Sequence, residues 1–68
     1  MNLRYMLVSG QYQAALSEFG EDEVRSEIDD MIYDDFADKA LAAAKALGYA
    51  DLERTAATVV RNSGAYGW

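Results

Sequence analysis

The 68-residue sequence contains no cysteine, no histidine and no proline. Without cysteine and histidine the chain has no disulfide framework, no structural zinc site, no thiol nucleophile and no imidazole base. It also lacks the Gly-x-x-x-x-Gly-Lys phosphate loop, the Gly-x-Gly-x-x-Gly dinucleotide turn and the Gly-x-Ser-x-Gly nucleophile elbow. These absences predict a non-enzyme that needs no cofactor.

The acidic run between residues 27 and 38 does not match a known metal-binding pattern. A calcium loop that starts at Asp30 or Asp34 would place Ile32 or Phe36 at its third position, and neither has the required glycine at the sixth. Acid–base catalysis by paired carboxylates would require a buried carboxyl group, which a chain this short is poorly able to provide. We therefore expect no metal site and no catalytic residues.

Long apolar runs are missing as well. No stretch approaches the roughly 20 residues that span a bilayer, and the N-terminus lacks the pattern of a signal peptide, so we expect a cytoplasmic protein without membrane contact. A domain of this size buries only about 60% of the surface of its unfolded chain, so a partner or a second copy, as in a homodimer, would add stability. The hydrophobic share of 51% nevertheless predicts a folded chain.

The five glycines divide the sequence into segments of helical length. Residues 3–19 show apolar positions at helical spacing with an interruption near Ser9 and Gly10, although residues 3–8 would also suit a short strand. Residues 21–33 place Val24, Ile28, Met31 and Ile32 on one face. Residues 36–47 do the same with Phe36, Ala40, Leu41, Ala44 and Leu47.

Residues 21–47 contain no helix breaker, so one long helix is an alternative. We prefer two helices because Asp34 or Asp35 can cap the N-terminus of the second, which Gly48 would end in a left-handed cap. The last helix is expected to begin after Asp51 and to end near residues 62–64. This pattern predicts an all-α domain over residues 1–64, a bundle of three to four short helices, followed by an aromatic tail over 65–68; the strand alternative would give an α+β fold.

One short motif resembles the tetratricopeptide repeat. Gly10, Tyr12, Ala15, Leu16 and Phe19 have offsets similar to those of its turn and second helix. The resemblance covers residues 10–19 and implies a packed helix–turn–helix, without the several copies that such repeats need.

The net charge of −6 is concentrated in the middle of the chain. Residues 18–38 carry ten acidic residues and one basic residue. On a helical wheel Glu23, Glu27, Asp30 and Asp34 form one row beside the apolar face, which we call the acidic stripe, and it extends about 16 Å along the axis. Such a row can pair with the arginines and lysines of a surface that normally holds a phosphate backbone.

Tyr33 lies opposite the apolar face of the same segment, with Asp22 and Asp29 beside it. An exposed tyrosine is typical of an interface anchor, and the alternative is that Tyr33 packs against another helix. Direct nucleic-acid binding is not expected, because the six basic residues are dispersed among acidic ones.

Small size, strong acidity, a helical frame and the absence of catalytic residues together resemble phage-encoded inhibitors of the anti-CRISPR and DNA-mimic type. That resemblance implies that the acidic stripe occupies a basic, nucleic-acid-binding surface of a partner complex. The alternative is a small helical adaptor or structural domain that binds protein, or itself, through apolar surface while its acidic residues serve only solubility.

Overall fold

The computed structural model describes residues 2–65, which form five α-helices and no strand. They are α1 (Leu3–Val8), α2 (Tyr12–Phe19), α3 (Glu21–Tyr33), α4 (Ala37–Leu47) and α5 (Ala50–Ala65). The all-α prediction is confirmed, and residues 3–8 are helical rather than extended. There are five helices instead of three to four because the chain breaks both at Ser9–Gly10 and after Tyr33.

The first two helices form a hairpin whose start is fixed by a side chain. The Asn2 side-chain oxygen accepts a 2.7 Å hydrogen bond from the backbone N–H of Tyr5, so Asn2 caps α1. Ser9 and Gly10 form the turn, as the sequence predicted, and Ala15 of α2 is fully buried. The small alanine lets α2 lie close to its neighbours.

The break between α3 and α4 was predicted correctly, but for a reason that is wrong. Neither aspartate caps α4, because Phe36 occupies its N-cap position and makes no side-chain capping bond. Asp34 instead ends α3, and Asp35 has a φ of 67°, in the left-handed region that aspartate tolerates better than most residues. The two aspartates therefore terminate one helix rather than start the next.

Gly48 ends α4 in the left-handed conformation, with φ 81° and ψ 23°, as predicted. The following helix starts at Ala50, so Asp51 lies in the first turn of α5 and the prediction that it is the N-cap is wrong. Helix α5 also continues to Ala65, slightly beyond its predicted end. Of the predicted aromatic tail over 65–68, residues 66–68 lie outside the described residues.

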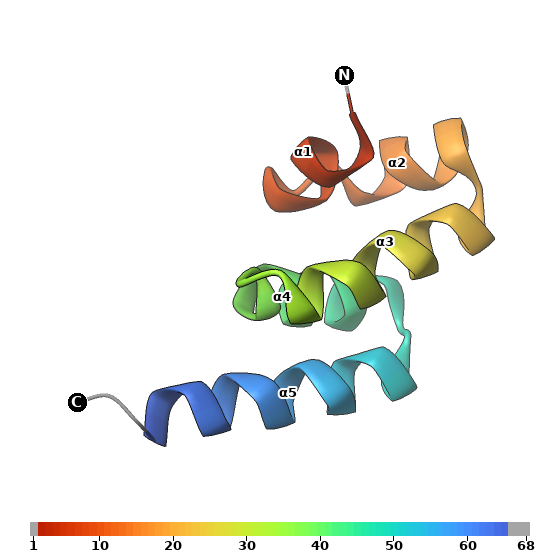
Figure 1. The fold of residues 1–68 in the computed structure, drawn as a ribbon. Helices are drawn as coiled ribbons and strands as arrows, with labels where there is room; N and C mark the ends of the chain where they lie inside the picture. Colours follow the sequence, from red (N-terminus) through yellow and green to blue (C-terminus); the bar gives the residue numbers. More distant parts are fainter. Residues whose placement is uncertain (1, 66–68) are drawn as a thin grey trace.

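Helices α3 and α4 lie between the α1–α2 hairpin and α5 (Figure 1), and α3 contacts all four other helices. The largest fully buried side chains are Leu7 of α1 and the predicted face of α3: Val24, Ile28, Met31 and Ile32. Alanines fill much of the remaining core, with Ala40, Ala43 and Ala44 of α4 and Ala56 of α5 at zero exposure. The bundle thus has a thin core that depends on close helix approach. Over the described residues, none of the helices combines the length and apolar character needed to cross a membrane.

Candidate functional site

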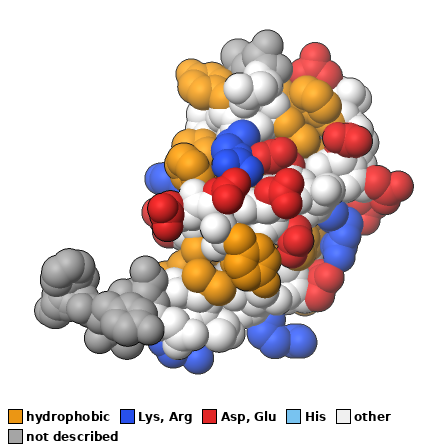
Figure 2. Space-filling view, in the orientation of Figure 1, with side chains coloured by type: hydrophobic (Ala, Val, Ile, Leu, Met, Phe, Trp, Pro, Cys, Tyr) orange, Lys and Arg blue, Asp and Glu red, His pale blue; other side chains and the backbone are white. Residues whose placement is uncertain are grey.

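The acidic residues of the predicted site belong to α3 and the residue that ends it. Three acids in the first turn, Glu21, Asp22 and Glu23, complement the positive end of the helix dipole. Because the apolar face of α3 is buried against the other helices, the acidic side is turned outward. Figure 2 shows Asp and Glu side chains gathered over the middle of the molecule, with a Lys or Arg side chain among them.

The structure places most of the predicted binding residues at the surface. Five of the seven are exposed acids and a sixth is half-buried; the exposed ones are Asp22, Glu23, Asp29, Asp30 and Asp34, and the half-buried one is Glu27. The seventh residue, Tyr33, is 68% exposed. The alternative in which Tyr33 packs against another helix is therefore wrong.

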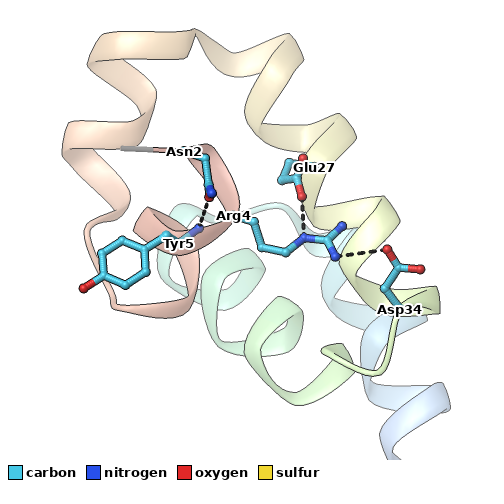
Figure 3. Close-up of polar contacts among 5 residues, drawn as sticks. All are labelled: Asn2, Arg4, Tyr5, Glu27 and Asp34. Atoms are coloured by element: carbon cyan, nitrogen blue, oxygen red, sulfur yellow. Dashed lines mark hydrogen bonds and ion pairs between the residues drawn. The ribbon is translucent and has the colours of Figure 1, made fainter.

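Two carboxylates of the acidic stripe pair with a residue of another helix, which was not among the predicted site residues. Arg4 reaches from α1 to α3 and places its Nε 2.6 Å from Glu27 Oε2 and its Nη1 3.0 Å from Asp34 Oδ2 (Figure 3). The guanidinium carbon lies 5.6 Å from the centre of the Phe36 ring, within reach of a cation–π interaction. The hydrogen bonds to Glu27 and then to Asp34 raise the pKa of Arg4. Two of the four carboxylates in the acidic stripe thus form ion pairs with an arginine of the same chain.

Phe36 was predicted to join the apolar face of its helix, and the structure corrects this. As the N-cap residue of α4 it precedes the helix, and 37% of its surface remains exposed. Ala37 is buried in the helix instead. The ring of Phe36 is consequently available to lie beneath the guanidinium of Arg4.

A second arginine makes a similar arrangement on the opposite flank of α3. Arg25 Nη2 lies 2.5 Å from Asp51 Oδ2, and its guanidinium carbon is 4.9 Å from the centre of the Tyr49 ring. The hydrogen bond with Arg25 lowers the pKa of Asp51, while burial raises the pKa of the Tyr49 phenol. This contact joins α3 to α5 and leaves the acidic stripe untouched.

Two features of the sequence, which the predictions did not use, could have indicated these contacts. Arg4 is the only charged residue before position 18, and Arg25 is the only basic one between 18 and 38. A single cation in an apolar or acidic segment is expected to find a carboxylate partner when the chain folds. The identity of that partner depends on tertiary packing, because Arg4 and Glu27 are 23 residues apart.

The seven predicted residues lie along α3 and the residue that ends it rather than converge on one point. Within residues 2–62 no buried position holds a charged side chain, and within the described part of the chain no group of three or more carboxylates is placed to hold a metal ion. The chain matches no protein-family model, no curated protein and no solved structure. Its function must accordingly be argued from the chemistry of these residues.

Proposed function

We propose that this chain is a non-enzymatic interaction protein that occupies a basic, nucleic-acid-binding surface of a partner protein and thereby competes with DNA or RNA. The observation that carries the proposal is the outer side of α3, where exposed carboxylates surround an exposed tyrosine. Such a surface offers charge-assisted hydrogen bonds to arginine and lysine, and Tyr33 adds an aromatic anchor among them.

The distribution of charge supports the same proposal. Dense like charge on one helix repels itself and disfavours the compact state, so folding alone does not explain it. The resemblance in size, acidity and composition to anti-CRISPR and DNA-mimic inhibitors from phages points to the same mode of action. In this mode the partner supplies the missing cations, and association is fast and sensitive to salt.

The structure shows how to design the charge-reversal test. Glu27 is a poor target because its replacement would also release Arg4 and weaken the contact between α1 and α3. The double variant Glu23→Lys/Asp30→Lys changes only exposed positions of the stripe. Glu18→Lys/Asp38→Lys is a matched control, since it changes one exposed Glu and one exposed Asp to lysine on α2 and α4.

The assay immobilises each version, incubates it with lysate of the native cells at low salt and elutes with duplex DNA at constant salt. We expect the wild type and the control to retain a nucleic-acid-binding protein that DNA displaces, and the stripe variant to retain much less. Retention that is insensitive both to DNA and to Glu23→Lys/Asp30→Lys would refute the proposal.

A second candidate is the adaptor that binds through apolar surface, and one observation favours it. Tyr5 and Tyr33 are 57% and 68% exposed, so two large aromatic side chains are available to an apolar partner surface. This candidate predicts that capture survives high salt and is lost in Tyr5→Ala/Tyr33→Ala. The buried leucines of α1 and α5 are unsuitable for this test, because their replacement would unfold the domain.

A further inference from the structure

We propose that Glu27, Asp34 and Phe36 form a guanidinium-binding site that Arg4 fills in the free protein and that an arginine side chain of the partner takes in exchange. This inference rests on the proposed function. It adds that the partner's contact is an arginine, and that Arg4 lowers the affinity of the protein for that partner.

The contacts of Arg4 define what the site binds. Two different nitrogens of one guanidinium meet two different carboxylates, at 2.6 and 3.0 Å, while the centre of the Phe36 ring lies 5.6 Å from the guanidinium carbon. A planar fork of donors that also lies over an aromatic ring suits arginine, whereas the ammonium of lysine is a compact point charge. The site is therefore selective for arginine.

The three groups that receive the guanidinium belong to one short stretch of chain. Glu27 lies on α3, Asp34 ends α3, and Phe36 begins α4, whereas Arg4 comes from α1. The packing of α3 against α4 sets the backbone positions of these groups. The three groups therefore stay near one another when the guanidinium of Arg4 leaves, and a second guanidinium can bridge the two carboxylates.

Arg4 is also accessible enough to be replaced. Its side chain is 30% exposed, and those of Glu27 and Asp34 are 24% and 56% exposed, so a guanidinium can reach the carboxylates from solvent. An arginine has enough rotatable bonds to swing into water without moving α1. Release of Arg4 returns two carboxylates to the acidic stripe, which then presents four outward charges to the partner.

It follows that Arg4 has opposite effects on folding and on binding. It joins α1 to α3, which stabilises the bundle, and it competes with the partner for Glu27 and Asp34, which weakens association. A residue with a purely structural role would lower both stability and affinity when it is removed.

The test compares Arg4→Gln with Arg25→Gln. Both substitutions make the net charge one unit more negative, and both remove an arginine held by a carboxylate and an aromatic ring. Only Arg4 lies at the acidic stripe. Each version is titrated with fluorescent oligo-arginine and oligo-lysine peptides of equal length by anisotropy, at several salt concentrations, and its thermal midpoint is measured by circular dichroism.

We expect both variants to melt at lower temperature than the wild type. Arg4→Gln should bind oligo-arginine about fivefold more tightly, with a smaller gain for oligo-lysine, because two carboxylates become available for surface ion pairs. Arg25→Gln should change peptide affinity much less. If Arg4→Gln does not fold, Arg4→Lys decides the question, since a lysine holds the carboxylates less well and should still raise the affinity for oligo-arginine.

Three results would overturn the inference: an unchanged or lower affinity of the folded Arg4 variant, an equal gain in both arginine variants, or an equal gain for both peptides. These results are separate from failure of the proposed function. The proposed function would fail if salt did not weaken binding by the wild type and if the Glu23→Lys/Asp30→Lys variant bound as tightly as the wild type.

Discussion

The substitution Ala44→Leu tests whether the bundle depends on close approach of α4 to its neighbours. Ala44 is fully buried within the core, together with Ala40 and Ala43 of the same helix. A leucine at this position adds carbon atoms where the helices leave no exposed surface. The side chain must then adopt a strained rotamer or push α4 away from the adjacent helices.

The expected cost follows from the burial of Ala44. Overpacking a filled core destabilises a protein by about 1–3 kcal/mol. A chain of this length has a total free energy of unfolding of about 3–10 kcal/mol. Since each kcal/mol shifts the midpoint of a small domain by about 4–8 °C, Ala44→Leu should lower the thermal midpoint by at least about 4 °C.

The matched control is Ala46→Leu, which places the same side chain on the exposed side of α4. Alanine and leucine differ little in helix propensity, so this variant should remain within about 0.5 kcal/mol of the wild type. Thermal and urea unfolding followed by circular dichroism at 222 nm, the usual helix signal, measure both variants. Equal stability of Ala44→Leu and Ala46→Leu would show that α4 does not pack against α3 and α5 as the structure describes.

Three further predictions concern single positions. Gly48→Ala should destabilise the chain by about 1 kcal/mol in urea unfolding, because its φ of 81° disfavours any side chain although the space around it is open; an unchanged midpoint would contradict this. The hydrogen bond with Arg25 lowers the pKa of Asp51 in the folded state. Asp51 therefore contributes its full stability above its ordinary pKa of 3.8, and this contribution is lost as the pH falls through the lower folded-state pKa. Asp51→Asn should accordingly melt below the wild type at neutral pH and approach it under strongly acidic conditions, whereas a gap that stays constant with pH would argue against the ion pair. Tyr33→Ala should leave the thermal midpoint nearly unchanged, since the side chain is 68% exposed, and should weaken capture of the partner; a large loss of stability would mean that Tyr33 packs against the fold.

The helices could be predicted from sequence because their signals are local. The apolar positions of α3 repeat with the period of a helix, and Gly48 provides the left-handed residue that ends α4. The position of the break after Tyr33 was also found. Its mechanism was not, since an aspartate can either cap the start of a helix or adopt the left-handed conformation after one. The choice between the two depends on how the flanking helices pack.

The residues of the candidate site could be predicted from the sequence, but their contacts could be predicted only in part. Helical periodicity correctly placed the acidic residues and Tyr33 on the outside of α3. The engagement of Glu27 and Asp34 by Arg4 was not predicted, because it depends on how α1 crosses α3. A wheel drawn for one helix contains no information on the residues of another.

The ion pairs of the fold bear on why the acidic block exists. Of the ten acidic residues between 18 and 38, the ion pairs within residues 2–65 engage only Glu27 and Asp34, both through Arg4. The one arginine inside the block, Arg25, pairs outside it with Asp51 of α5. Arg4 and Arg25 therefore attach α1 and α5 to the two flanks of α3, and these contacts leave most of the outer charge of α3 without neutralisation. Such charge opposes compaction, and the proposed cationic partner would neutralise it; in that proposal Arg4 is the internal contact that the partner displaces to use the whole stripe.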